Sequence, residues 1–329
     1  MAHAIDHVLL AVTDPDGSRS TLPLAAAFAA ANGARLSVLL VDEPIPDLAG
    51  VARMVELPVE VVAEATLADR LTRFEAVMDG LELPERPDVS VRVGTPFVEI
   101  IRHVVTHAVD MVIKAPDARG GLLGNVLTST DQHLLRKCPG IVWLSDAAPR
   151  GLPRSVVLAV DVDDGGASEP ATVAALNERL LGCARAIAAG PDAELHLVHL
   201  WDAPGAAVVE QWSKESDPHA AAERYAAGIE ADRRAAFAQL EAQLLDAQGA
   251  NGRSGIRVRA HFLRGSARQQ LPELTRRLGA EVLVMGTTAR TSVPGLIIGN
   301  TAEDVLNSVD CGVLTVKPPS FTSPISADD

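Results

Sequence analysis

Two short segments near the carboxyl end hold the residues best suited to chemistry. Residues 286–289 read Gly-Thr-Thr-Ala and residues 299–301 read Gly-Asn-Thr, with nine residues between them. The first segment follows an apolar run that is typical of a buried parallel strand, and the second begins a helical pattern. A turn of small residues before a helix N-terminus leaves backbone N–H groups around a concavity, a common way to bind phosphate. The pattern indicates a phosphate site or, more simply, a helix cap and a tight turn.

The spacing of these segments differs from two familiar phosphate-binding motifs. It lacks the Gly-Lys-Ser/Thr of a Walker P-loop, and it is not the G-x-G-x-x-G dinucleotide motif. It resembles the G-x2-G-x9-G-(S/T) signature of the universal stress proteins (UspA family), with Ala289 for the second glycine and Asn300 for the Ser/Thr. The resemblance implies an adenine nucleotide such as ATP, bound near Gly286, Gly299 and Thr301.

An internal repeat divides the chain. Residues 8–13 recur at 156–161, and five later identities share one offset of 171 residues: Gly94 with Gly265, Ala118 with Ala289, Arg119 with Arg290, Gly124 with Gly295, and Thr130 with Thr301. We therefore expect two lobes of one fold, at 1–148 and 154–320, joined by a Pro/Gly-rich linker and followed by an acidic tail at 321–329.

Each lobe alternates short β-branched runs with longer segments of helical period, which is the α/β pattern. In the second lobe, near-continuous apolar strands favour a parallel sheet with helices on both faces. Ser266 and Asn300 are the expected N-caps of its last two helices. The expected strands and helices of this lobe lie near 155–161, 193–200, 256–263, 281–286 and 312–316, and near 170–189, 220–247, 267–278 and 301–308.

The whole chain resembles the universal stress protein fold, once in each lobe, as in the tandem two-domain members (the UspE type). The strings that carry the resemblance lie at 130–139, 286–303 and 316–318. It implies two Rossmann-like lobes, each with five parallel strands in the order 3-2-1-4-5. Family dimers form through the last strand. Segments 141–144 and 312–316 are therefore expected to meet in an intramolecular pseudo-dimer, because a sheet edge needs cover. A homodimer of the chain is a further alternative.

In this strand order the connections reverse between strands 1 and 4, and ligands of open α/β sheets bind in that crevice. In the second lobe the crevice lies between Asp161 and Gly286. The resemblance implies that Asp161 binds ribose hydroxyls; alternatively it caps the following turn. Glu303 and Asp304 place negative charge on the first turn of the last helix and should weaken phosphate binding, an effect that Arg290 could offset.

The first lobe has lost this signature. Its aligned positions are Ala115, Ala118 and Thr128, and Thr13 stands where the second lobe has Asp161. We interpret the first lobe as structural, or as a site for some other, less charged ligand.

Composition narrows the class of protein. The 329 residues carry a formal net charge of −14, which argues against a nucleic-acid partner. No apolar run approaches the roughly 18 residues needed to span a membrane, and the N-terminus lacks the features of a signal peptide. Three scattered cysteines suit a reducing compartment. We expect a cytoplasmic protein with a small-molecule ligand.

The sequence contains no recognisable catalytic constellation and no metal-ligand pair, since His196 and His199 point to opposite faces of a strand. Mg²⁺ bound with a nucleotide by Asp161, Asp163 and Asp164 is an alternative to a solvated acidic turn. The predicted function is nucleotide binding in a stress response without significant turnover. Two alternatives stay open: a sensor or carrier of a partly apolar ligand lined by residues 293–298, and a weak nucleotide hydrolase.

Overall fold

The computed structural model describes residues 5–83, 85–117, 129–145, 151–162, 170–188, 193–250, 256–287 and 299–327. The elements of the first lobe are β1 (His7–Val12), α1 (Ser18–Asn32), β2 (Arg35–Asp42), α2 (Leu48–Met54), α3 (Val59–Asp79), β3 (Asp88–Val93), α4 (Pro96–His107), β4 (Met111–Lys114), α5 (Ser129–Lys137) and β5 (Ile141–Leu144). Those of the second lobe are β6 (Ser155–Ala159), α6 (Pro170–Ile187), β7 (Glu194–Trp201), α7 (Gly205–Trp212), α8 (Pro218–Ala250), β8 (Arg257–Arg264), α9 (Ala267–Arg277), β9 (Val282–Gly286), α10 (Asn300–Leu306) and β10 (Gly312–Val316).

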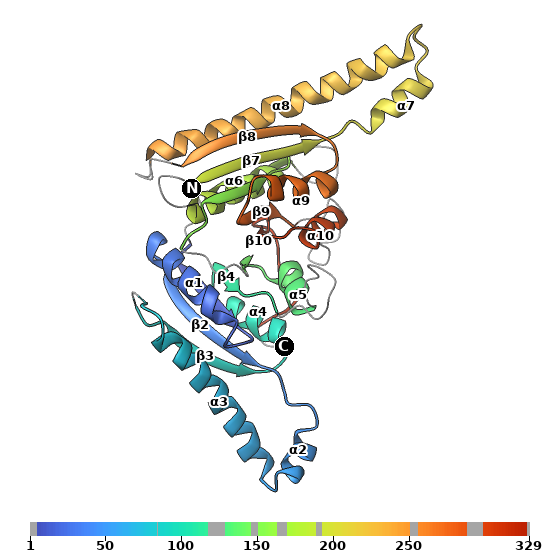
Figure 1. Ribbon diagram of the computed structural model, residues 1–329. Coiled ribbons are helices and arrows are strands. Elements are labelled where there is room, and N and C mark those ends of the chain that lie inside the picture. The colour runs from blue at the N-terminus through green and yellow to red at the C-terminus, as the bar shows by residue number, and fades with distance from the viewer. Residues whose placement is uncertain are drawn as a thin grey trace.

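All ten of these strands form one sheet, in the order β3-β2-β1-β4-β5-β10-β9-β6-β7-β8 (Figure 1). Within each lobe the strands are parallel and follow the predicted order 3-2-1-4-5. The lobes join where β5 pairs antiparallel with β10, with Trp143 opposite Leu314. The predicted pseudo-dimer is therefore confirmed, and it covers the two terminal strand edges.

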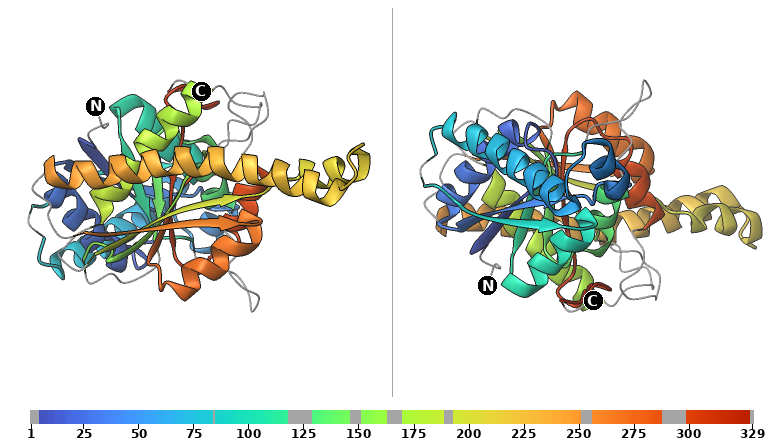
Figure 2. Two further views of the ribbon diagram at one scale, coloured as in Figure 1. Left: turned by 90° about the horizontal axis from the view of Figure 1, so that it is seen from above. Right: turned by 90° about the horizontal axis from the view of Figure 1, so that it is seen from below.

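Helices cover both faces of this sheet, which explains why its central strands are apolar almost throughout. Every residue of β1 is buried. Alternate strand residues enter two apolar clusters, one shared with α1, α3, α6 and α8, the other with α4, α5, α9 and α10. Both clusters contain residues of both lobes, so the apolar core runs through the junction. Figure 2 shows α8 lying along the sheet and extending with α7 beyond it.

The structure corrects two details of the second lobe and confirms a third. The sequence interpretation missed α7. Gly299, not Asn300, is the N-cap of α10: the Gly299 carbonyl accepts a hydrogen bond from the Glu303 N–H at 3.0 Å, which leaves Asn300 inside the first turn. Ser266 is the N-cap of α9 as predicted, but its side chain makes no capping hydrogen bond.

One buried ion pair distinguishes the lobes. The Lys114 ammonium at the end of β4 lies 3.0 Å from the Asp131 carboxylate on α5, and both side chains are fully buried. Burial raises the pKa of Asp131, and the charge of Lys114 opposes that shift. At the repeat offset, the second lobe has Met285 and Ala302, which belong to one apolar cluster. At equivalent positions, the first lobe therefore has a buried ion pair and the second lobe has two apolar side chains that pack in the core.

A second buried lysine crosses the junction between the lobes. Lys317, just beyond β10, is 3% exposed and donates a hydrogen bond from Nζ to the Leu135 carbonyl of α5 at 2.6 Å. Burial lowers the pKa of Lys317 from 10.5 to about 8. The second lobe therefore donates to a free carbonyl near the C-terminal end of a first-lobe helix, where a positive charge is favourable.

The Lys317 ammonium should make stability depend on pH. Below pH 8 both states carry the proton, and the full cost of burying the ammonium is present. Between pH 8 and 10.5 the unfolded chain binds a proton that the folded chain does not, so the free energy of unfolding rises with pH. We expect wild type to gain roughly 2 kcal/mol between pH 8 and 10 relative to Lys317→Met, by denaturant unfolding. Parallel pH profiles for the two proteins would contradict this assignment.

The Lys114–Asp131 pair predicts a non-additive mutant cycle. Lys114→Met leaves the buried Asp131 carboxylate without its cationic partner and should cost about 3–5 kcal/mol, whereas Asp131→Ala leaves Lys114 paired with Asp117 alone. The double variant reproduces the side chains of the second lobe, and we expect it to lose less stability than either single variant. Denaturant unfolding of the four proteins measures the coupling energy. Losses that simply add would show that the pair is not coupled.

Candidate functional site

Two crossover points of the sheet are candidate sites, one in each lobe. At each, the chain leaves two neighbouring parallel strands in opposite directions, which opens a crevice beyond their carboxyl ends. In the first lobe these strands are β1 and β4, where Ala11 lies opposite Lys114. In the second lobe they are β6 and β9, where Ala159 lies opposite Met285.

In the second lobe, Asp161 and Gly286 lie at the same edge of the sheet, as predicted. Asp161 comes two residues after Ala159, and its carbonyl accepts a hydrogen bond from Asn177 of α6 at 2.7 Å. Gly286 ends β9 close to the same helix: a Cβ there would lie 2.8 Å from Cδ2 of Leu176. The close neighbour of Gly286 among the described residues is therefore an apolar side chain of the protein.

Thr287, the next residue, was not among the predicted site residues. Its side chain is buried and its Oγ1 has no hydrogen-bond partner among the described residues, while its N–H donates to the Val316 carbonyl at 3.3 Å. An unpaired buried hydroxyl costs stability, so it is a candidate contact for a ligand. The Gly-Thr-Thr string contained this signal, because Thr287 directly follows the strand.

The remaining predicted residues divide into two groups. Asn300 and Thr301 have exposed side chains in the first turn of α10, and Gly299 is half-buried at its N-cap. Ala289 and Arg290 lie outside the described residues, as do Asp163, Asp164 and the segment 293–298. Asp161 and Gly286 thus lie together beyond the carboxyl ends of β6 and β9, and α10 begins at Asn300, within one residue of the expected start.

The charges at the start of α10 differ from the expectation. Glu303 forms an ion pair with Arg136 of α5, in the first lobe. Asp304 forms one with Arg268 of α9, at 2.6 Å between Oδ2 and Nε. Each carboxylate therefore has an arginine beside it, which reduces the net negative charge at the start of α10. The expected weakening of phosphate binding by Glu303 and Asp304 stays a prediction.

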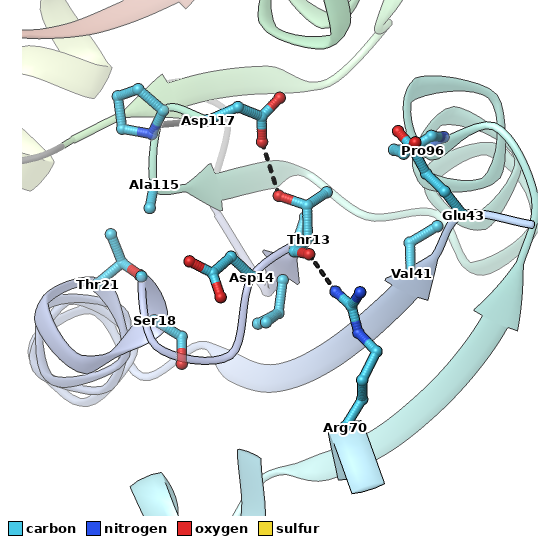
Figure 3. Close-up of a pocket in the computed structure, with 14 residues that line it drawn as sticks. Thr13, Asp14, Ser18, Thr21, Val41, Glu43, Arg70, Pro96, Ala115 and Asp117 are labelled. Atoms are coloured by element: carbon cyan, nitrogen blue, oxygen red, sulfur yellow. Dashed lines mark hydrogen bonds between the residues drawn. The ribbon is translucent and has the colours of Figure 1, made fainter. Parts of the chain in front are cut away.

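The first lobe contains a cavity of about 400 Å³ at its own crossover (Figure 3). It lies between the carboxyl ends of β1, β2 and β4 and the beginning of α1. The sequence analysis interpreted this lobe as structural or as a site for a less charged ligand. It did not predict where in the lobe a cavity would lie. The polar side chains that line it are those of Thr13, Asp14, Ser18, Thr21, Glu43, Arg70 and Asp117.

Hydrogen bonds and ion pairs fix much of this lining. Thr13 Oγ1 donates to Asp117 Oδ1 at 2.7 Å, and Lys114 forms an ion pair with the same carboxylate. Arg70 of α3 donates to the Thr13 carbonyl and pairs with Asp42 at 2.8 Å. These contacts could not be predicted from the sequence. Arg70 is distant in sequence from Thr13 and Asp42, and Lys114 directly follows an apolar run.

Among the described residues, no cluster of three or more His, Cys, Asp or Glu side chains could hold a metal ion. Within the same part of the chain, no helix combines the length and apolar character that a membrane crossing requires.

Comparisons with known proteins agree with this architecture. The model of the universal stress protein family matches residues 4–145 and 154–317. The chain is 30% identical to universal stress protein E of Escherichia coli K12 over 236 residues, which cover 71% of this chain and 69% of that protein.

Two solved structures resemble the whole fold. A functionally unknown protein of Pseudomonas aeruginosa PAO1, PA1789, has a TM-score of 0.62 at 22% identity, covering 96% of this chain and 93% of its own. A universal stress protein of Archaeoglobus fulgidus has a TM-score of 0.57 at 17% identity, covering 96% and 99%. With two family matches in tandem and a ten-stranded sheet built from two 3-2-1-4-5 halves, the chain belongs to the universal stress protein family.

Proposed function

We propose that this universal stress protein binds an adenine nucleotide, such as ATP, in its second lobe without significant turnover. The observation that carries the proposal is the position of Asp161 and Gly286 at one edge of the sheet, beside the unpaired hydroxyl of Thr287. That crossover is where ligands of open α/β sheets bind. We assign the site to a second lobe of residues 154–320 and the protein to the cytoplasm.

Each proposed contact follows from the chemistry of its residue. The Asp161 carboxylate would accept hydrogen bonds from ribose hydroxyls. Gly299 lacks a Cβ, so the ligand can approach its backbone closely, while Gly286 leaves room for Leu176 at the end of β9 and would contact the ligand through its backbone. Ala289, Arg290, Asn300 and Thr301 complete the proposed phosphate side, and Mg²⁺ would enter only with the nucleotide.

Electrostatics in this region are compatible with an anion. The ion pairs Arg136–Glu303 and Arg268–Asp304 balance the negative charges on the first turn of α10. Phosphate therefore does not meet two uncompensated carboxylates there.

The same ion pairs argue against catalysis. Phosphoryl transfer needs positive charge aimed at the developing negative charge of the transition state. Arg136 and Arg268 are held by carboxylates, and Arg179 of α6 donates to the Lys317 carbonyl at 2.6 Å. These arginines near the site are already engaged, which supports binding without efficient hydrolysis.

A second candidate ligand is partly apolar and is not a nucleotide. It is favoured by Leu176, whose side chain lies against Gly286 where a fully polar site would be expected. Absence of nucleotide binding in the titration below would support this alternative.

We expect titration of the full chain with ATP to show one site that depends on the second lobe. Asp161→Asn should weaken binding about tenfold, because it removes a charge-assisted hydrogen bond at constant side-chain volume. Gly286→Val should abolish binding, because its side chain would collide with Leu176 and displace the backbone at the crossover. Calorimetric titration measures both affinities.

Two matched substitutions in the first lobe serve as controls for this titration. Ala115→Val adds bulk at the position equivalent to Gly286, and Asp14→Asn removes a carboxylate beyond the equivalent strand; both should leave ATP affinity unchanged. Retained ATP binding in Asp161→Asn and Gly286→Val, or its loss in the first-lobe variants, would overturn the assignment. Because Gly286→Val also presses on Leu176, its thermal unfolding is compared with wild type.

We expect steady-state ATP hydrolysis by the purified protein to stay well below about 1 s⁻¹, the low end of ordinary enzymes, even with Mg²⁺ present. The reason is that the arginines near the site in the described part of the chain, Arg136, Arg179 and Arg268, already have partners. Phosphate release under saturating ATP measures the rate. Faster turnover that disappears in Arg290→Ala would place the protein among the hydrolases.

A further inference from the structure

We propose that the first-lobe cavity is a second, separate site and that its ligand is a small aliphatic amine. The cavity of about 400 Å³ lies within the usual size of small-molecule sites. Its described lining is mainly acidic and offers carboxylates and hydroxyls to a cation.

The charges that line the cavity are mainly negative. Three carboxylates, of Asp14, Glu43 and Asp117, accompany one guanidinium, of Arg70. Arg70 is held through its two terminal nitrogens by Asp42 and by the Thr13 carbonyl, while its Nε–H has no hydrogen-bond partner among the described residues. Asp14 and Glu43 are exposed, and neither forms an ion pair with another described residue. Two carboxylates are therefore available to a ligand.

Several of the described donors beside the cavity are already used. The Lys114 ammonium contacts Asp117, Asp131 and the Ala115 carbonyl, and it is fully buried. At the start of α1, the Ser18 N–H donates to the Pro15 carbonyl at 3.2 Å, and the Arg19 N–H to the Asp16 carbonyl at 3.3 Å. Among the described residues, an anion would thus meet three carboxylates and one guanidinium that is already paired with Asp42, which is unfavourable.

Thr21 gives independent evidence for a polar ligand. It lines the cavity from α1, its side chain is 1% exposed, and its Oγ1 has no hydrogen-bond partner among the described residues. In Figure 3, Thr21 lies with Asp14 at one end of the cavity, and Glu43 lies at the other. A ligand N–H beside Thr21 would satisfy this hydroxyl, whose isolation otherwise costs stability.

This arrangement fits an extended amine with more than one nitrogen. One ammonium group would lie between Asp14 and Thr21, and a second near Glu43, with methylene groups against Val12, Val41 and Pro96. Charge-assisted hydrogen bonds to carboxylates supply the orientation, and the apolar lining supplies contact area.

The test uses spermidine as the probe and the full chain in calorimetric titration. We expect saturable binding with one spermidine per chain. The double variant Asp14→Asn/Glu43→Gln should weaken it at least tenfold. Glu60→Gln/Glu64→Gln, which removes the same charge from the exposed face of α3, should leave it unchanged and so separates the cavity from general attraction to an acidic protein.

Thr21→Val is the decisive single variant, because it keeps the side-chain volume and removes only the hydroxyl. We expect spermidine affinity to fall several-fold while the unfolding midpoint stays the same or rises, since an unpaired buried hydroxyl is lost. Non-saturable binding, equal losses in both double variants, or unchanged affinity in Thr21→Val would overturn the proposal.

Two further measurements separate this site from the proposed nucleotide site. Asp161→Asn should leave spermidine binding intact, and ATP at saturation should not displace spermidine. Displacement by ATP, or tighter binding of ribose than of spermidine, would show that the cavity takes a different class of ligand. If the protein binds spermidine as expected but does not bind ATP, the nucleotide proposal is wrong and the amine proposal is supported.

Discussion

Three residue pairs between β5 and β10, from Leu144 with Val313 to Val142 with Thr315, join two five-stranded sheets into one. A terminal strand left open would expose a row of unpaired N–H and C=O groups, so each lobe needs the other for cover. Trp143 on β5 is fully buried and meets the ring of Phe28 edge-on, with 5.9 Å between ring centroids. The junction is therefore part of the apolar core.

Because β5 and β10 pair antiparallel, the strands of one lobe run against those of the other. The carboxyl ends of the strands, and with them the two crossovers, therefore lie on opposite sides of the sheet. The C-terminal turn of α5 then meets the second lobe. Arg136 pairs with Glu303 at the start of α10, and the Leu135 carbonyl accepts the Lys317 ammonium. The first lobe thus contributes charge to the neighbourhood of the proposed nucleotide site, a role that no single lobe could provide.

The two lobes have diverged at the same structural positions. Lys114 and Asp131 stand where the second lobe has Met285 and Ala302. The ion pair also holds Asp117, because the Asp131 carboxylate accepts the Asp117 N–H at 3.1 Å. In the first lobe the chain beyond β4 is consequently held by carboxylates, beside the crossover proposed to bind an amine. The two proposed sites would therefore have opposite charge preferences on one shared backbone.

The sequence alone determined the α/β class and the tandem repeat, because periodicity and the constant offset between the halves can be read along the chain. The strand order and the covering of the terminal strands were implied by the resemblance to the universal stress proteins, which rests on local strings such as the one beginning at Gly286. Only the tertiary structure decided which charges are free. The partners of Glu303, Lys317 and Arg70 lie far away in sequence, and their pairing depends on how the helices pack. The cavity and the isolated Thr21 hydroxyl were beyond prediction for the same reason: they are properties of the space between elements.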